Sequence, residues 1–307
     1  MATGSVVQPR RSRFPRSKSV IPIIVVTMVA VLFITLSPGV SRVYAASVFG
    51  ALRAPGEPAF VAGHRGDRSN APENTLPALQ AALDSSLAFV ETDVQLSKDG
   101  VPVLIHDESV DRTTNGKGAV DTLTLKQLKK LDAGKWYAPR FAGTRIPTLD
   151  EFLEVFAAAE ALAADKKVLM ELKGFWPKEN VQTVVELIEA RGVEGRVTLA
   201  SFDYTTLMNI EKVGPSFPRV IITRELPGDP VGLATHFGAI AILTSADGLR
   251  EHPAAVEEMH EAGLGLLLYT LNSEERWGEA LALGVDGIIT DKPSTLDKWL
   301  AETAPGT

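Results

Sequence analysis

From residue 57 onward, short apolar stretches alternate with segments whose apolar residues recur every three or four positions. The apolar stretches are short and rich in branched residues, as expected for buried β-strands. The eight predicted strands are residues 60–63, 89–94, 168–172, 197–201, 220–223, 240–244, 266–270 and 287–290. The predicted helices are residues 75–85, 149–164, 181–191, 204–213, 231–237, 253–262, 274–283 and 294–302.

Strands that alternate with helices indicate a parallel α/β architecture. Eight such units in about 240 residues match the size of a (β/α)8 TIM barrel, which is the fold that we predict. A doubly wound open sheet is the alternative, because periodicity alone does not separate an open sheet from a closed one. No glycine-rich dinucleotide fingerprint follows the first strand, which argues against an open-sheet oxidoreductase.

One connection is much longer than the others, between the second and third predicted strands. Its first part, residues 91–107, alternates apolar and polar positions around a turn at Lys98, Asp99 and Gly100, which predicts a β-hairpin. A short, loop-rich insertion follows at about residues 107–147. Two interpretations stay open for it: a lid or wall over a site at the barrel rim, or a packed surface excursion.

The first 46 residues are typical of an export segment. Basic residues precede an apolar run at residues 20–36, and Val43 and Ala45 fit a small-residue cleavage pattern. An uncleaved membrane anchor is the alternative, since the apolar run is at the lower limit for crossing a bilayer. We therefore expect residues 1–46 to be a signal peptide or an anchor, with residues 20–36 as the tether in the second case.

Residues 47–307 are predicted to form the barrel domain on the outer side of the cytoplasmic membrane. The domain would be secreted, held in the cell wall or periplasm, or anchored to the outer face of that membrane. Residues 1–46 hold six basic residues and no acidic one, so the remainder has 25 basic against 38 acidic residues. This acidic balance argues against a nucleic-acid partner, and no protein partner is predicted.

Polar residues end several predicted strands, and a parallel barrel brings these ends to one face. His64 and Arg65 follow the first strand. Glu91 and Asp93 are two positions apart in the second strand, so their side chains lie on the same side of it. The same spacing separates Glu171 and Lys173 at the third strand. The hairpin returns a second histidine to a place opposite residues 92–93. The residues expected to meet at this face are His64, Arg65, Glu91, Asp93, His106, Glu171 and Lys173.

This combination of side chains suits cleavage of a phosphodiester. The chain has no cysteine, so three carboxylates favour one hard divalent cation, Ca²⁺ or Mg²⁺. Arg65 and Lys173 supply positive charge for an anion, and two histidines suit a base and an acid on opposite sides of a reacting phosphorus. A simple ion pair between Glu171 and Lys173 is the structural alternative for those two residues.

The remaining histidines and one aspartate are interpreted as structural. His236, His252 and His260 fall on predicted outer helices or loops. Asp291 follows the last strand and either caps the next helix or orders the site, and we prefer the cap.

Several motifs, taken in order, resemble those of the glycerophosphodiester phosphodiesterase family. They are GHRG with PENT, ETDVQLSKDGVPVLIHD, RTTNG, IPTLDE, ELK, SF, YTLN and GVDGIITDKP, and they cover roughly residues 60–300. The resemblance implies a (β/α)8 barrel that hydrolyses glycerophosphodiesters to glycerol 3-phosphate and an alcohol with a bound divalent metal. Tyr269 stands where the family often has tryptophan, which bears on substrate preference only.

The resemblance also implies roles for individual residues. The paired catalytic histidines fall on His64 and His106, and the phosphate-binding cations on Arg65 and Lys173. The metal-binding carboxylates fall on Glu91, Asp93 and Glu171. The alternatives are a phospholipase D-like enzyme that cleaves lysophospholipids or sphingolipids, and a catalytically silent barrel that acts as a binding protein.

Overall fold

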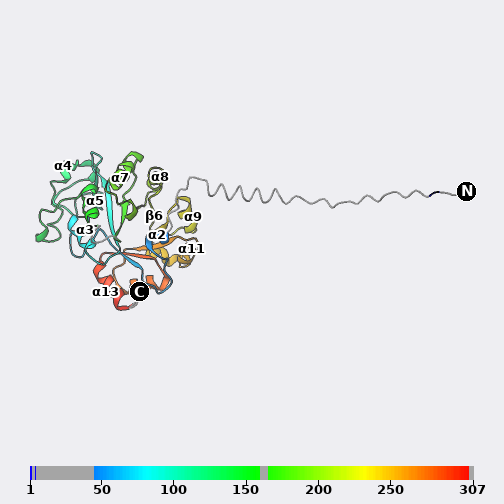
Figure 1. Cartoon of the computed structure of the whole chain (residues 1–307). Helices are drawn as coiled ribbons and strands as arrows, with labels where there is room; N and C mark the ends of the chain where they lie inside the picture. Colours follow the sequence, from blue (N-terminus) through cyan, green and yellow to red (C-terminus); the bar gives the residue numbers. More distant parts are fainter. Residues whose placement is uncertain (2–3, 5–44, 160–164, 304–307) are drawn as a thin grey trace. The chain divides into compact units, whose positions relative to one another are not determined.

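The computed structural model describes residues 1, 4, 45–159 and 165–303. Residues 43–307 form one compact unit, the described part of which is seen in Figure 1. In the described part of this unit, helices surround a sheet of nine strands. The strands are β1 (Phe60–Gly63), β2 (Phe89–Leu96), β3 (Pro102–Leu104), β4 (Lys167–Leu172), β5 (Val197–Ser201), β6 (Arg219–Ile222), β7 (Ala241–Ser245), β8 (Gly265–Tyr269) and β9 (Gly287–Thr290).

Eight of these strands form a closed parallel barrel in the order β1-β9-β8-β7-β6-β5-β4-β2. The barrel closes where β1 pairs in parallel with β2, with Ala62 opposite Phe89 and Gly63 opposite Val90. Strand β3 runs antiparallel to β2 and forms the predicted hairpin. The TIM-barrel prediction is therefore confirmed, and the open sheet is wrong because an open sheet leaves β1 and β2 unpaired.

Helices follow most of the strands, and most of the helices cover the outside of the barrel. They are α2 (Ala45–Phe49), α3 (Leu76–Leu83), α4 (Leu125–Leu128), α5 (Leu149–Ala158), α7 (Lys178–Ala190), α8 (Tyr204–Val213), α9 (Pro230–His236), α10 (Ala246–Glu251), α11 (Ala255–Glu261), α12 (Glu274–Leu283) and α13 (Pro293–Thr303). Short 3₁₀ helices are η1 (Val120–Thr122), η2 (Pro139–Phe141) and η3 (Glu194–Arg196).

Most predicted bounds agree with the structure to within three residues, and those of β1, β5, β9, α8 and α12 agree fully. The helix predicted at 149–164 ends earlier, at Ala158, and residues 160–164 lie outside the described residues. Helices α2, α4 and α10 were not predicted. The apolar run at 20–36 and most of the export segment lie outside the described residues, and no described helix is long and apolar enough to cross a membrane.

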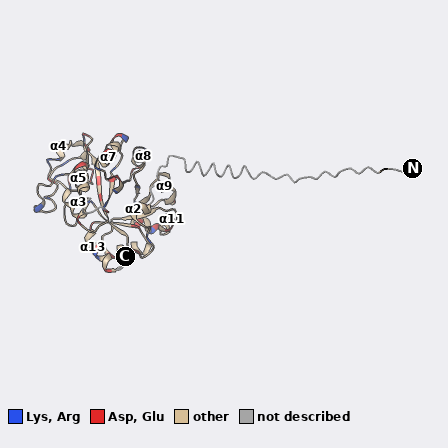
Figure 2. Cartoon of the chain, in the orientation of Figure 1, with Lys and Arg blue, Asp and Glu red and all other residues tan. Residues whose placement is uncertain are grey.

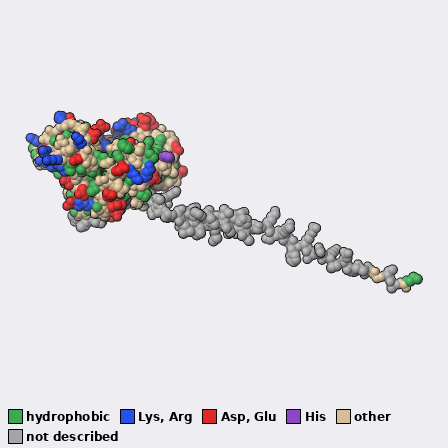
Figure 3. Space-filling view, turned by 90° about the horizontal axis from the view of Figure 1, so that it is seen from above, with side chains coloured by type: hydrophobic (Ala, Val, Ile, Leu, Met, Phe, Trp, Pro, Cys, Tyr) green, Lys and Arg blue, Asp and Glu red, His purple; other side chains and the backbone are tan. Residues whose placement is uncertain are grey.

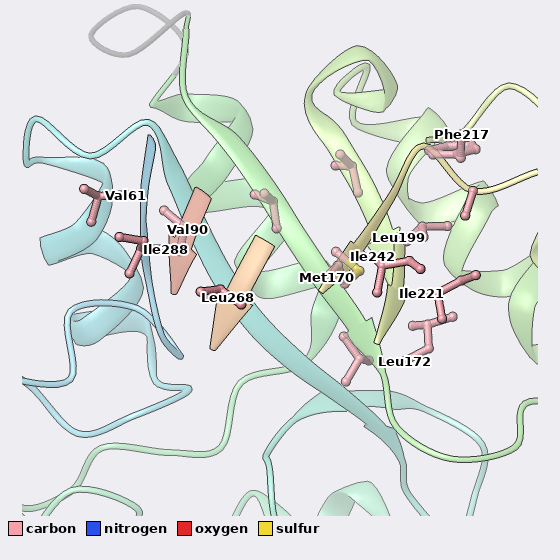
Figure 4. Close-up of a cluster of buried hydrophobic side chains, with 14 of the residues drawn as sticks. Val61, Val90, Met170, Leu172, Leu199, Phe217, Ile221, Ile242, Leu268 and Ile288 are labelled. Atoms are coloured by element: carbon pink, nitrogen blue, oxygen red, sulfur yellow. The ribbon is translucent and has the colours of Figure 1, made fainter. Parts of the chain in front are cut away.

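Alternate residues of each strand point to two different apolar layers. One layer lies between the strands and the helices, and Figure 4 shows part of it, including Val61, Val90, Met170 and Ile288. The other layer contains the neighbouring positions, such as Phe60, and fills the inside of the barrel. This alternation follows from the two-residue period of a strand.

The helix α2 closes the end of the barrel at which the strands begin. Phe49 of α2 stacks on Phe60 with ring centroids 5.2 Å apart and lies 5.9 Å from the ring of Phe89. Phe60 and Phe89 are the first residues of β1 and β2, and Ala45 and Phe49 are buried. The predicted domain boundary after residue 46 falls within this helix.

The insertion packs on the end of the hairpin through a small apolar core. The buried residues of this core are Val103, Ile105, Val110, Val120, Leu128, Ala133 and Ile146. Backbone hydrogen bonds such as that from Val120 N to Glu108 O hold it together. The insertion is thus a packed excursion, and the residues near its start reach the barrel rim. Figure 3 shows basic and acidic side chains interspersed over one face of the molecule.

We predict that Phe49→Ala lowers the free energy of unfolding by about 3–5 kcal/mol, because it leaves a cavity against two buried rings. Urea denaturation of the purified protein measures this change. Met208→Ala on α8, where the side chain is about one-third exposed, is the matched control and should cost less than about 1 kcal/mol. A loss for Phe49→Ala as small as that of the control would contradict the sealing role of α2.

Candidate active site

A cavity of about 730 Å³ opens at the end of the barrel where the strands finish. All seven residues predicted to meet there line it. Figure 2 shows acidic positions inside the ring of helices as well as on its outer surface. The other lining residues are Asp107, Glu108, Leu169, Gly174, Phe202, Tyr204, Ile222, Thr223, Arg224, Leu243, Tyr269, Thr270 and Ile289.

Three buried carboxylates form the floor of the charged part of this cavity. Glu91 and Asp93 lie on the inward face of β2, two and four residues after Phe89, and Glu171 lies on the neighbouring strand β4. Each offers an oxygen within 4.8 Å of the oxygens of the other two. Strand pairing places Asp93 directly beside Glu171, so the cluster follows from strand register.

The pKa values of the three carboxylates are shifted in different directions. Burial and the charge of Asp93 raise the pKa of Glu91 well above its ordinary value, and the same two causes raise the pKa of Glu171 to about 7. Burial alone would also raise the pKa of Asp93, but Lys173 and Arg65 lower it to about 2. Nearby protein cations therefore stabilise the ionised form of one carboxylate much better than that of the other two.

This arrangement fits a hard divalent cation. All three donors are carboxylate oxygens, which Mg²⁺ and Ca²⁺ prefer. Close, buried carboxylates repel one another when ionised, and a cation between them would relieve that repulsion. The three predicted residues thus form a group that could hold a metal.

Two histidines line the same cavity, and each is held by an aspartate. His64 Nδ1 lies 2.6 Å from Asp291 Oδ1, and His106 Nδ1 lies 2.8 Å from Asp107 Oδ1. An ionised carboxylate only accepts hydrogen bonds, so Nδ1 carries the proton in each ring and Nε2 is the free nitrogen of the neutral form. Burial lowers the pKa of both histidines, while the aspartates oppose this effect.

The contacts of Asp291 differ from the helix cap that we preferred from the sequence. The carboxylate of this residue also accepts hydrogen bonds from Arg68 and Asn272, at 3.1 and 2.8 Å. It therefore orders the site, which was the less favoured alternative. His252 and His260 form ion pairs with carboxylates outside this cavity, and the ring of His236 packs on Phe237, as the structural interpretation predicted.

The two predicted anion-binding cations are embedded among carboxylates. Lys173 Nζ lies 2.9 Å from Glu171 Oε1 and 3.5 Å from Asp93 Oδ1. Lys173 therefore forms the ion pair with Glu171 that was the structural alternative, and it also lies near a second carboxylate. Arg65 Nη1 donates to Glu73 Oε1 at 2.6 Å. The backbone N–H of Arg65 also donates to Glu91 Oε2, at 2.7 Å.

The turn after β1 is tightly specified. Gly66 has φ of +82°, and a Cβ atom there would lie 2.6 Å from the backbone of Ala78. Asn74 Nδ2 donates to Asp93 Oδ2 at 2.8 Å, and its backbone N–H donates to the carbonyl of Arg65 at 3.0 Å. The sequence predicted where the site residues converge but not the supporting residues Arg68, Asp107 and Arg112. Their adjacency to the HRG and IHD segments was the available signal.

Comparison with known proteins shows that this chain is similar to phosphodiesterases. A family model described as "Glycerophosphoryl diester phosphodiesterase family" matches residues 64–295. The chain is 36% identical to a glycerophosphodiester phosphodiesterase of Caldanaerobacter subterraneus over 240 residues, covering 77% of this chain and 96% of that one. It is 33% identical to one from Bacillus altitudinis over 230 residues, covering 75% and 93%.

A solved structure of a phosphodiesterase is also similar to this chain. An Oleispira antarctica phosphodiesterase, in complex with the product sn-glycerol-3-phosphate, superposes with a TM-score of 0.72 at 28% identity. The match covers 78% of this chain and 95% of that one.

We predict that the chelator-treated protein loses stability as the pH rises from about 5 toward 7.5. The folded state holds a proton on Glu171, whose pKa is about 7, in a range where the unfolded state, with a pKa of about 4.3, has released it. The loss is at most about 3 kcal/mol. Urea denaturation across this pH range measures it, and added Mg²⁺ or Ca²⁺ should reduce it.

Glu171→Gln is the matched variant, because it keeps the shape of the side chain and removes the titrating group. Its stability without metal should depend less on pH than that of the parent protein. A parent protein whose metal-free stability stays constant or rises over this range would contradict the assignment of Glu171.

Proposed function

The chain belongs to the glycerophosphoryl diester phosphodiesterase family, and from this membership we propose that it hydrolyses glycerophosphodiesters to sn-glycerol 3-phosphate and an alcohol by histidine acid–base catalysis beside a divalent cation. The observation that carries this mechanism is the presence of two His–Asp pairs and a buried triad of carboxylates in one cavity. Membership of an enzyme family also argues against the silent binding barrel.

Glu91, Asp93 and Glu171 would hold the cation, which we propose to be Ca²⁺ or Mg²⁺. When bound, such an ion polarises a phosphoryl oxygen and offsets negative charge in the transition state. Arg65 and Lys173 line the same cavity and would orient the diester through its remaining phosphate oxygens.

The two histidines supply proton transfer. The free Nε2 of one neutral histidine takes the proton of the nucleophile, which is water or the glycerol 2-hydroxyl, as a new P–O bond forms. The other histidine, protonated, donates a proton to the leaving alkoxide oxygen as the old P–O bond breaks. Attack by water gives glycerol 3-phosphate directly. Attack by the 2-hydroxyl gives a cyclic phosphate, and a water molecule then opens the ring in a second step, with the two histidines in exchanged roles, to give glycerol 3-phosphate. Each aspartate fixes its ring and stabilises the imidazolium form.

We further propose that the enzyme acts outside the cytoplasmic membrane. The basic residues and the apolar run in residues 1–46 support export, with residues 20–36 as the tether if the segment is retained. Treating spheroplasts with an externally added protease tests this proposal: exported enzyme is degraded, and a cytoplasmic enzyme survives.

We predict that the purified protein releases glycerol 3-phosphate from glycerophosphocholine or glycerophosphoethanolamine, that chelation stops the release, and that Ca²⁺ or Mg²⁺ restores it. An enzyme-coupled assay for glycerol 3-phosphate measures this reaction. Headgroup release from lysophospholipid micelles, with no activity on the soluble diesters, would instead support the phospholipase D-like alternative.

We predict that His64→Ala and His106→Ala each lower kcat by about 10²-fold or more, because each removes one proton-transfer group. His252→Ala is the matched control, since its ring pairs with Glu258 outside the cavity, and it should retain full activity. Losses below tenfold in a variant with an unchanged circular dichroism spectrum would contradict the assigned role.

A further inference from the structure

Glu73 lies in the turn between β1 and α3, and its side chain is only 2% exposed. Its Oε1 atom accepts N–H groups from Arg65 at 2.6 Å and Arg112 at 2.7 Å, and its Oε2 atom is 2.9 Å from Arg112 Nη1 and 2.8 Å from Arg68 Nη2. A carboxylate has about four acceptor positions, so three arginines saturate this one. No role in the mechanism above uses Glu73.

One arm of this network leads from Glu73 to His106. Arg112 donates from Nη1 and Nη2 to Glu73, and from Nε and Nη2 to Asp107 at 2.7 and 3.0 Å. Asp107 in turn holds Nδ1 of His106. The planar fork of one guanidinium therefore joins two carboxylates, and it fixes the orientation of the aspartate that orients the ring.

The other arm leads from the same carboxylate to His64. Arg68 lies 2.8 Å from Glu73 Oε2 through Nη2, and it donates from Nη1 to Asp291 Oδ1 at 3.1 Å. Asp291 holds Nδ1 of His64. The two arms have the same order of groups, carboxylate, arginine, aspartate and histidine, and they meet at Glu73.

We propose that Glu73 is a positioning residue that sets both histidines in one fixed arrangement, through Arg112 and Asp107 on one side and Arg68 and Asp291 on the other. This inference rests on the proposed function, because it assigns Glu73 a part in the same reaction. Glu73 touches no reacting atom in this scheme.

The chemistry explains why such a link matters. The attacking and leaving oxygens of a phosphoryl transfer lie roughly in line, so the base and the acid must stand on opposite sides of the phosphorus at a set separation. A displacement of about 1 Å in such a site can cost on the order of 10²-fold in rate. A single carboxylate that anchors both histidines makes their positions interdependent.

The charge of Glu73 suits this role. Burial alone would raise its pKa, but the hydrogen bond from Arg112 and the charges of Arg65 and Arg68 lower the pKa to about 2. Glu73 is therefore ionised at every pH at which the histidines act. The next residue, Asn74, donates to Asp93, so one turn supports both the histidine network and the carboxylate triad.

The first test is Glu73→Gln in the full chain with its metal. The amide keeps the shape but turns an NH₂ group toward an arginine, so at least one arm is broken. We expect kcat to fall about 10- to 100-fold with KM changed less than about threefold. Arg191→Gln removes a guanidinium from an ion pair with Asp150 outside the cavity, and as the matched control it should leave both constants unchanged. A folded Glu73→Gln variant with kcat within twofold of wild type overturns the proposal.

The second test asks whether the two arms depend on Glu73. Arg68→Gln and Arg112→Gln are measured in the wild-type and Glu73→Gln backgrounds, as double-mutant cycles. We expect each substitution to cost less than about threefold once Glu73 is replaced. The same cost in both backgrounds shows independent arms and overturns the proposal. If Glu73→Gln does not fold, the Arg68→Gln/Arg112→Gln double variant decides: a loss smaller than the product of the single losses supports the link, and the full product overturns it.

A readout that does not need catalysis separates this proposal from the proposed function. Nitrogen-15 NMR of the five histidine rings reports which ring nitrogen carries the proton. In wild type, neutral His64 and His106 should hold it at Nδ1, and Glu73→Gln should produce mixed tautomers at both rings. If wild type releases no glycerol 3-phosphate, the proposed function fails, while this tautomer comparison still tests the link. Unchanged tautomers in Glu73→Gln overturn the proposal.

Discussion

Charge compensation at the end of the barrel is the constraint on which the rest of the site depends. Strand register on β2 and β4 brings three carboxylates together in a buried place, where like charges are costly. Arg65 and Lys173 favour the ionised form of Asp93, but the pKa values of Glu91 and Glu171 stay raised. The proposed cation would stabilise the ionised forms of these two glutamates, which the cations of the protein itself do not.

The opposite end of the barrel makes this unfavourable arrangement tolerable. There, the same inward-facing rows of side chains begin with Phe60 and Phe89, and the ring of Phe49 packs against both. Along β2 the inward positions change from Phe89 to Glu91 and Asp93 within four residues. Strand β2 therefore contributes to apolar packing at its start and to the candidate site at its end, which is how a parallel barrel separates stability from function.

The sequence predicted the parts of the molecule that periodicity controls. Glu91 and Asp93 lie on a strand, where a two-residue period fixes the direction of each side chain, so their convergence was predictable. Glu73, Arg68 and Arg112 lie in turns or loops, whose side-chain directions no period fixes. Their contacts join residues 39 positions apart, as between Arg112 and Glu73, or 223 apart, as between Arg68 and Asp291. The role of α2 was missed because its residues adjoin a segment that is typical of export.

The turn between β1 and α3 shows why these unpredicted contacts matter. Among the described residues, only Arg65 and Asn74 combine a side chain with a positive φ, at 56° and 52°. Such a conformation costs roughly 1 kcal/mol or more per residue, so it persists only where the surroundings require it. Both residues are buried and both contact the carboxylate network, Arg65 through Glu73 and Asn74 through Asp93. Backbone strain and charge compensation therefore occur in the same turn, from which side chains reach both the histidine network and the carboxylate triad.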